Sequence, residues 1–493
     1  MTCNALWFRL LRWQIVMFAV CLSTLAAVAF AAPPTPAEAL LERAEKAMGT
    51  EQLKAVQFIA QGTGYAIGQS FDPGKPWPRM KYPAYALLAD FEHAALREEI
   101  VRERTDVTGG PHGTGEQRLT QFLRDQSAWN MLGPIPVPAP WTVTERISTL
   151  WSTPHGALKA ARRHSATLKL QGVRTLAFTQ AGQFQSVVQL ATNFQVQEVR
   201  TTVPHPVLGD TLVVTRYSNY STFEGLPHPG RIVQTWGGYP ALDLSIEQVQ
   251  VNPPFEITIP DRARNAPERV QPELLAPGVW LLAGASHHSV AIAMKDHVLL
   301  VDSPVSDARA IAITETMAKL TPDKKIAYVI NTHPHFDTLG GLRGMVAQGA
   351  QLMAAESSRA TLARALGGSH RIAPDSLSQA SAQLRTLPGI TGISGKSVLS
   401  DGERKVEIYP IQGSLHARGM LMVYLPAEKL LIQSDAYTPG PPFSAPPSVP
   451  QAAHTNLLAN MERLKLQVER IVPLRGRVVP VADLYLAVGR AAP

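Results

Sequence analysis

Hydrophobic residues in the segment 36–49 repeat at the spacing of a helix. Leu40, Leu41, Ala44 and Met48 fall on one side of such a helix, because residues three and four positions apart share a face. The pattern therefore predicts an amphipathic helix over 36–49 that buries this face against the rest of the protein.

The pattern then changes to short runs of strand-forming residues. Segments such as 54–60, 212–217 and 244–251 are rich in β-branched and aromatic residues, and Gly-Gly and Pro-Gly turn signals separate the runs. A helical insert at about 147–164 interrupts them. We therefore predict a mostly antiparallel, β-rich N-terminal domain over residues 35–262, built on a curved sheet or half-barrel.

A second change of pattern begins at Gly278, where short apolar strands start to alternate with helices. The first of these elements are strands at 279–283, 290–294 and 297–301, a helix at 306–320 and a strand at 326–330. Such alternation is typical of an α/β arrangement in which helices cover sheets. It predicts a C-terminal domain over 270–493, which the proline-rich stretch 253–267 links to the first domain.

The N-terminus has the three parts of a secretory signal. Arg9 and Arg12 form a positive beginning, an uncharged apolar run covers 13–30, and a small-x-small cleavage site ends at Ala31. We therefore expect residues 1–31 to be a signal peptide. The alternative for this segment is an uncleaved membrane anchor, because the apolar run is nearly long enough to span a bilayer.

Both cysteines of the chain, Cys3 and Cys21, lie inside the expected signal. The mature chain would then have no thiolate to form a disulfide, bind a metal or attack a substrate. No other segment is long and apolar enough to cross a membrane. The sequence thus predicts a periplasmic or secreted protein without a stable membrane span after removal of the signal.

Composition and charge narrow the class of protein. The 493 residues exceed the size of one ordinary domain, and 45% hydrophobic with 17% charged residues is typical of a globular chain. The formal net charge is +7, but the basic residues are scattered rather than clustered. We therefore expect no nucleic-acid partner.

The segment 330–341 carries the strongest chemical signal. A buried strand ends at a loop in which His333, His335 and Asp337 stand at alternate positions, and Gly340 and Gly341 follow, where we expect a tight turn into a helix. Alternate positions of an extended loop can present two imidazoles and a carboxylate to one cation, and zinc accepts these ligands when no thiolate is present. The alternative is a loop with two histidines and no metal.

This segment resembles the Thr-His-x-His-x-Asp-x-x-Gly-Gly motif of the metallo-β-lactamase superfamily, which also follows a strand. Four more landmarks stand in the order of that family. They are Asp302 at the end of a strand, Gly413–His416, Lys429–Asp435 and Ile471–Arg477. The resemblance covers about 220 residues and implies an α/β fold, the αββα sandwich of the family, for the C-terminal domain.

The resemblance also implies a set of metal ligands. His333, His335 and His416 match the first zinc site of the family, and Asp337 and Asp435 match the second.

Two positions depart from this pattern. Thr338 and Arg475 stand where the family has histidines of the second site. Threonine is a poor zinc ligand, and a permanently protonated guanidinium cannot ligate a metal. We therefore expect one Zn²⁺ per chain, with Arg475 and Thr338 replacing the second site.

Two further regions are weaker candidates. His287 and His288 follow a strand that lies near the metal cleft in this family, so either can contact substrate. The segment 217–252 resembles, without a sharp motif, the curved sheet of periplasmic lipoprotein-carrier proteins.

These features favour an exported, zinc-dependent hydrolase of a small-molecule ester, thioester, lactone or amide. A zinc-activated water would be the nucleophile, and Asp337 would orient the water or accept its proton. The alternative is a catalytically degenerate family member that binds a periplasmic ligand or partner. A diiron oxidoreductase is disfavoured, because its second metal would lack both imidazoles.

Overall fold

The computed structural model describes residues 33–491 except 107, 112–114, 386–388 and 443–448. The expected signal peptide, 1–31, and both cysteines lie outside the described residues. None of the helices in the described ranges is long and apolar enough to cross a membrane.

The first described element is helix α2 (Pro36–Met48), as the hydrophobic spacing predicts. Thr35 caps its N-terminus in a reciprocal bond with Glu38, and Gly49 ends it with a left-handed φ of 65°, which glycine adopts without strain. The buried face contains the four residues expected from the sequence.

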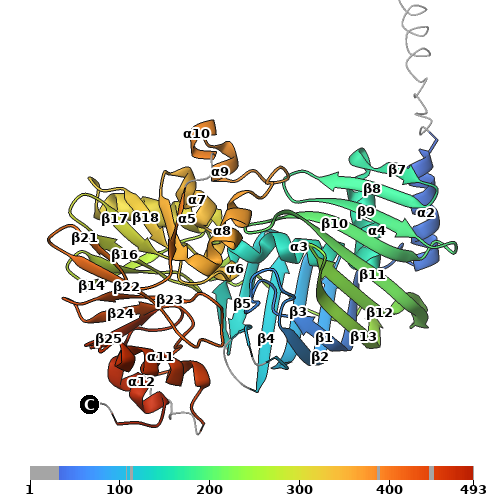
Figure 1. The fold of residues 1–493 in the computed structure, drawn as a ribbon. Helices are drawn as coiled ribbons and strands as arrows, with labels where there is room; N and C mark the ends of the chain where they lie inside the picture. Colours follow the sequence, from blue (N-terminus) through green and yellow to red (C-terminus); the bar gives the residue numbers. More distant parts are fainter. Residues whose placement is uncertain (1–32, 107, 112–114, 386–388, 443–448, 492–493) are drawn as a thin grey trace, which may run out of the picture.

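A 13-stranded antiparallel sheet forms the N-terminal part of the protein (Figure 1). Its strands are β1 (Ala55–Tyr65), β2 (Arg79–Asp90), β3 (Ala95–Arg104), β4 (Glu116–Arg124), β5 (Ser127–Leu132), β6 (Ile135–Pro138), β7 (Lys169–Gly172), β8 (Thr175–Gln180), β9 (Phe184–Leu190), β10 (Val196–His205), β11 (Gly209–Phe223), β12 (Leu226–Trp236) and β13 (Tyr239–Val251). β1 pairs with both β2 and β13, so β6 and β7 are the two edges.

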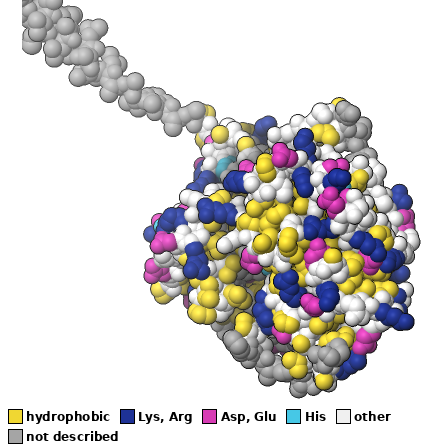
Figure 2. Space-filling view, turned by 90° about the vertical axis from the view of Figure 1, so that its left-hand side faces the viewer, with side chains coloured by type: hydrophobic (Ala, Val, Ile, Leu, Met, Phe, Trp, Pro, Cys, Tyr) yellow, Lys and Arg dark blue, Asp and Glu magenta, His cyan; other side chains and the backbone are white. Residues whose placement is uncertain are grey.

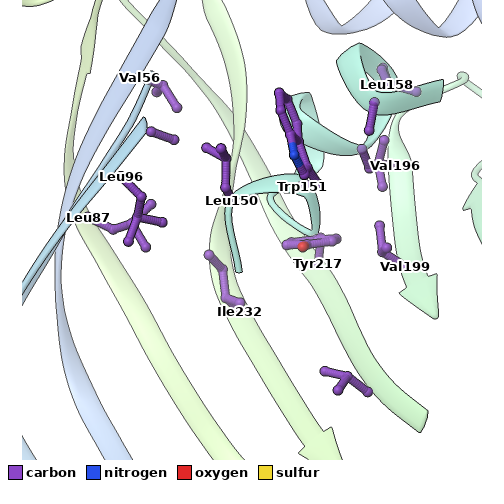
Figure 3. Close-up of a cluster of buried hydrophobic side chains, with 14 of the residues drawn as sticks. Val56, Leu87, Leu96, Leu150, Trp151, Leu158, Val196, Val199, Tyr217 and Ile232 are labelled. Atoms are coloured by element: carbon purple, nitrogen blue, oxygen red, sulfur yellow. The ribbon is translucent and has the colours of Figure 1, made fainter. Parts of the chain in front are cut away.

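The expected helical insert consists of two helices, α3 (Val143–Trp151) and α4 (Pro154–Arg163), instead of the single helix at 147–164. Pro154 cannot continue a helix, and Thr153 caps the new one by accepting a hydrogen bond from Gly156 N. α3 contacts β3–β5 and also β10, which are far apart in the strand order, so the sheet curves around it. Figure 3 shows Leu150 and Trp151 of α3 between side chains of both halves of the sheet.

The C-terminal part contains two packed sheets. A seven-stranded sheet contains β14 (Gln271–Ala276), β15 (Val279–Ala283), β16 (Ser289–Ala293), β17 (Val298–Val301), β18 (Ile326–Ile330), β19 (Gln351–Ala355) and β20 (Ile390–Ile393). A six-stranded sheet contains β21 (Ser397–Ser400), β22 (Lys405–Pro410), β23 (Leu421–Leu425), β24 (Leu430–Gln433), β25 (Arg470–Pro473) and β26 (Val479–Pro480). β17–β20 run parallel to one another, whereas β14–β17 and β21–β24 are antiparallel.

Helices cover both outer faces of these sheets. α5 (Asp307–Leu320), α7 (Leu342–Ala347) and α8 (Arg359–Leu366) pack on the larger sheet, and α11 (Ala452–Arg463) and α12 (Val481–Ala487) pack on the smaller one. Three shorter helices are α6 (Phe336–Leu339), α9 (Ser376–Gln379) and α10 (Ala382–Arg385). The αββα sandwich and the β-rich first domain are therefore confirmed.

The run Val298–Val301 shows why the strands of the larger sheet are continuously apolar. Leu299 and Val301 point into the core between the two sheets, and Leu300 points into the core under the helices. Both faces of this strand are buried, so every position must be hydrophobic.

The two parts of the molecule are in direct contact. Val207, between β10 and β11, is buried in the core of the C-terminal helical layer. Ile257 and Ala263, within the stretch expected to be a linker, are buried against Leu88 and Trp129 of the N-terminal sheet. Figure 2 looks onto the side at the left of Figure 1, where Lys and Arg are dispersed among acidic and neutral side chains.

Candidate metal centre

Strand β18 leads into the histidine motif, which lies at the interface between the two parts of the molecule. After Ile330 the chain leaves the sheet, and the loop 331–335 leads into α6. His333 and His335 are fully buried. A third histidine, His416, lies in the connection between β22 and β23 and is also buried. The smaller sheet thus completes a cluster that the larger sheet begins.

The three imidazoles are close enough to share one ion. Their ring centroids are 4.6 Å apart for His333 and His335, 5.1 Å for His333 and His416, and 4.4 Å for His335 and His416. One nitrogen from each ring lies within 4.8 Å of the others. The structure thus brings together the three residues that the sequence assigns to the first metal site.

Hydrogen bonds set which nitrogen of His333 faces the cluster. Thr332 Oγ1 donates to Asp302 Oδ2 (2.6 Å), so it accepts from His333 Nδ1 (3.1 Å). The proton is thereby held on Nδ1 and the lone pair on Nε2, which is the form that binds a metal. His333 Nε2 lies 3.5 Å from Asp435 Oδ2.

Asp302 holds the start of the loop in place. It also accepts from the backbone of Thr332 (2.7 Å) and has a left-handed φ of 56°. Burial raises the pKa of its carboxyl to about 7, although the bonds from Thr332 oppose the shift. This geometry agrees with the structural role that the family resemblance implies for this position.

A carbonyl from the N-terminal domain sets the form of His335. Its Nε2 donates to Ser70 O (3.1 Å), which leaves Nδ1 as the nitrogen with a lone pair. Ser70 belongs to the β1–β2 segment (residues 66–78), which crosses from the first domain to the metal centre. Sequence reasoning missed this contact, because a backbone carbonyl has no residue signature.

Other bonds fix the β1–β2 segment on the metal domain. Gly68 O accepts from Phe336 N (3.3 Å), and Phe71 O accepts from Arg418 N (2.9 Å). The side chain of Arg418 forms an ion pair with Asp72. The segment is therefore bonded to the metal domain on both sides of Ser70, the residue that contacts His335.

Arg475 occupies the space beside the two carboxylates of the expected second site. Its Nη2 lies 2.6 Å from Asp337 Oδ2, and its Nε lies 3.5 Å from Asp435 Oδ1. The charges of Asp435 and Asp337 raise the pKa of Arg475, against the effect of burial. The guanidinium group thus neutralises the two carboxylates that would otherwise bind a second cation.

Asp337 is the most constrained carboxylate of the centre. Its Oδ2 also lies 3.3 Å from His287 Nε2 and accepts from Gln69 Nε2 at 3.4 Å. Burial acts to raise its pKa, but the bond from His287 and the charge of Arg475 together bring the pKa well below its usual range. Its other oxygen, Oδ1, is buried and forms no hydrogen bond with any described residue.

Thr338 stabilises the loop through its hydroxyl group. Its Oγ1 lies 2.6 Å from His333 O and 2.9 Å from His335 O, and accepts from Asn331 Nδ2 (3.3 Å). The side chain of Thr338 therefore forms hydrogen bonds with backbone carbonyl groups of the loop and does not serve as a metal ligand.

Gly340 and Gly341 form the expected turn, which connects α6 to α7. Gly340 and Gly341 have helical φ values of −59° and −98°, which other residues adopt as well. A side chain at either position would collide with the backbone of Ser303–Val305. Glycine is needed here for close packing.

The two histidines after β15 have different surroundings. His287 contacts Asp337 and Arg475, and Ser286 Oγ lies 2.8 Å from its Nδ1. His288 is used for structure, because its Nδ1 accepts from Gly284 N and its Nε2 donates to Gly476 O. The structure thus places His287, and not His288, at the metal centre.

Comparison with known proteins gives one family. Residues 283–477 match the family model of the metallo-β-lactamase superfamily. A similar curated protein is the 2,4-dinitroanisole O-demethylase subunit alpha of Nocardioides sp. strain JS1661, 26% identical over 188 residues, which are 38% of this chain and 51% of that protein. The match thus spans about half the length of that relative.

Similar solved structures are metallo-β-lactamases. The enzyme from Pontibacter korlensis is 15% identical and covers 45% of this chain and 98% of its own, with a TM-score of 0.35. FIM-1 from Pseudomonas aeruginosa is 21% identical over 45% and 94% of the two chains, with a TM-score of 0.32. The C-terminal domain of this protein, at residues 283–477, belongs to the metallo-β-lactamase superfamily.

Proposed function

We propose that the protein is an exported hydrolase that uses one zinc ion held by His333, His335 and His416. One observation carries the proposal: three buried imidazoles converge, and hydrogen bonds hold His333 and His335 in the form that binds metal. Zinc accepts such a set and keeps a fourth position for water or substrate.

Two buried atoms fit such an ion. His333 Nε2 and Asp337 Oδ1 are buried, and neither forms a hydrogen bond within the described part of the chain. Buried polar atoms of native proteins are nearly always bonded, so these atoms support a ligand at this place. A zinc ion there would supply Lewis acidity, which lowers the pKa of water to about 7 and polarises a carbonyl group.

The residues around the site divide the remaining work. Asp337 stays ionised because of Arg475, and its low pKa makes it a weak base, so it orients the attacking water through Oδ1. Hydrolysis joins the water oxygen to the carbonyl carbon and breaks the bond to the leaving oxygen, nitrogen or sulfur. The leaving atom takes up a proton. Esters, thioesters, lactones and amides are the proposed substrates.

Metal content and activity test this function together. Protein purified without added metal should contain one zinc per chain by elemental analysis and hydrolyse a generic ester, a thioester, a lactone or a β-lactam. An aryl methyl ether should be assayed as well, because the curated relative is named as a subunit of an O-demethylase of 2,4-dinitroanisole. Two tightly held ions would contradict the single-zinc site. No metal and no turnover would favour a ligand-binding protein, which the occupation of the second site by Arg475 also allows.

Two substitutions separate ligation from chemistry. His416→Ala should abolish zinc binding, because only two of the three imidazole ligands would remain. Asp435→Ala should lower activity more than zinc content, because Asp435 also pairs with Arg475. Equal zinc content in both variants would contradict the ligand assignment.

The export of the protein is a separate proposal. The sequence of residues 1–31 favours cleavage after Ala31. N-terminal sequencing of protein from the cell envelope should begin near Ala32, and an intact Met1 in the membrane fraction would identify an anchor.

A further inference from the structure

A cavity joins the metal centre to the N-terminal domain. It has a volume of about 220 Å³ and begins at Asp337 and His287. Its remaining walls come mostly from the first domain, including Trp141, Glu145 and Trp236. A substrate that reaches Asp337 through this cavity therefore contacts both domains.

A second cavity lies behind the first, inside the curved sheet. Its volume is about 280 Å³, and it shares Ile67, Glu145 and Trp236 with the first cavity. Each cavity alone is at or below the lower limit for a small-molecule site, and together they fall within the usual range. The shared residues indicate that the two form one cleft that leads away from the metal.

Two carboxylates and two guanidinium groups line the inner cavity, and one of the carboxylates, that of Glu145, lies where the two cavities meet. Glu98 and Glu145 both line it, and Arg146 is the guanidinium whose charge acts on both. Arg146 is buried and already donates to Phe122 O and Trp129 O, at 2.8 and 2.9 Å. The charge of Arg146 thus acts on two carboxylates, while these hydrogen bonds go to backbone carbonyl groups.

Glu145 is the acceptor that these contacts leave open. Glu98 accepts a hydrogen bond from Tyr85 Oη (2.6 Å). Across the described ranges, the carboxylate of Glu145 forms neither a hydrogen bond nor an ion pair, although it stands on the wall of both cavities. Glu98 is half-buried and Glu145 is exposed, so the carboxylate of Glu145 is accessible to a cation that enters the cleft.

Aromatic side chains line the same cavity as these carboxylates. Tyr65, Tyr82 and Trp236 line the inner cavity, and aromatic faces attract cations. The other basic residue, Arg102, donates through Nε to Gln117 (2.9 Å).

We propose that the cleft binds a substrate with a protonated amine remote from its scissile bond, the ammonium lying at Glu145 and Glu98 and the scissile bond at the metal centre. The inference rests on the proposed hydrolase function. It assigns substrate selection to the N-terminal domain.

Binding and hydrolysis test the inference separately. By calorimetry, hexylammonium should bind the zinc-loaded protein about tenfold or more tightly than hexan-1-ol, the effect of a hydrogen bond between charged groups. p-Nitrophenyl 6-aminohexanoate should exceed p-nitrophenyl hexanoate in kcat/KM by a similar factor. Glu145→Gln should remove both preferences. Glu99→Gln is the matched control, because Glu99 is exposed and lines neither cavity.

The outcomes distinguish the two proposals. If neither ester is hydrolysed but hexylammonium still binds through Glu145, the hydrolase function fails and the amine site stands. If both esters react equally and the amine binds no better than the alcohol, the amine site is overturned and the hydrolase function stands. Preferences that persist in Glu145→Gln would also overturn it.

Discussion

Arg475 shows how one residue changes the chemistry of a metal site. A histidine at this position would offer a lone pair, whereas the guanidinium offers only donors and a fixed charge. It pairs with Asp337 at 2.6 Å and lies 3.5 Å from Asp435. Asp435 is buried and the side chain of Asp337 is only 15% exposed, so both carboxylates need a positive partner, and Arg475 supplies it.

Replacing Arg475 with alanine should make the stability of the protein depend on a second ion. Without added metal, unfolding in urea should show a loss of up to about 3–5 kcal/mol, the cost of leaving buried carboxylates without their partner. Added zinc should restore stability and raise the content to two ions per chain. Arg477→Ala is the control, because its ion pair with Asp483 is partly exposed. A single ion and unchanged stability in Arg475→Ala would contradict this role.

Thr332 provides a second test at the residue scale. Thr332→Val keeps the shape of the side chain but removes the hydroxyl between Asp302 and His333. Zinc affinity, measured by competition with a chelator, should fall about 10- to 100-fold, as for other partners of metal-bound histidines. Thr332→Ser keeps the hydroxyl and should retain most of the affinity. Equal affinities for the two variants would show that the bond does not orient His333.

At the scale of elements, the β1–β2 segment joins the two domains at the metal centre. Ser70 O holds His335, Gln69 reaches Asp337, and Gly68 lies against Phe336. The metal site is therefore built from both sheets of the sandwich and from a loop of the first domain.

Two glycines of this segment form a matched pair for testing it. Gly68 and Gly74 have positive φ values of 74° and 85°, so alanine strains both equally. A Cβ at Gly68 would collide with the ring of Phe336, whereas one at Gly74 would come no closer than 4.0 Å to Arg364. Gly68→Ala should therefore displace Ser70 and lower zinc affinity about 10-fold or more, and Gly74→Ala should not. The same affinity in both variants would mean that the segment does not support His335.

At the scale of the whole molecule, buried histidines link stability to pH. Burial lowers the pKa of His155 to about 3 and that of His228 to about 4. The unfolded chain has an ordinary histidine pKa near 6.5. Below pH 6.5 the unfolded state therefore binds more protons, and stability falls as the pH falls towards 4.

The double variant His155→Gln and His228→Gln should reduce this loss. Each histidine contributes up to about 1.4 kcal/mol per pH unit between pH 6.5 and its folded pKa. Urea unfolding at pH 7.5, 6.0, 5.0 and 4.5 should thus show a steeper loss of stability in the wild type than in the variant. The variant at pH 7.5 sets the baseline cost of the substitutions. Parallel curves would contradict the contribution of these two residues.

Much of the fold follows from local patterns in the sequence. Helix α2 agrees with the predicted spacing, and strand β18 has the expected bounds of 326–330. The helical insert divides at Pro154. This break could have been predicted from the sequence, because proline cannot continue a helix. These features depend on side-chain period and on capping, which act over a few residues and are therefore legible without the fold.

The histidine cluster could be predicted for a similar reason. His333, His335 and Asp337 stand in one loop, and the order of landmarks supplied His416 and Asp435. The sequence also indicated that Arg475 cannot ligate a metal, because that property belongs to the residue itself.

Only the tertiary structure decided how the N-terminal domain takes part. Ser70 and His335 are separated by 265 positions, and the bond between them uses a carbonyl that every residue possesses. The same holds for the cleft, where Glu145 becomes significant because the curved sheet places it beside both cavities. Sequence periodicity determines which face of an element is buried, and the packing of distant elements determines what that face meets.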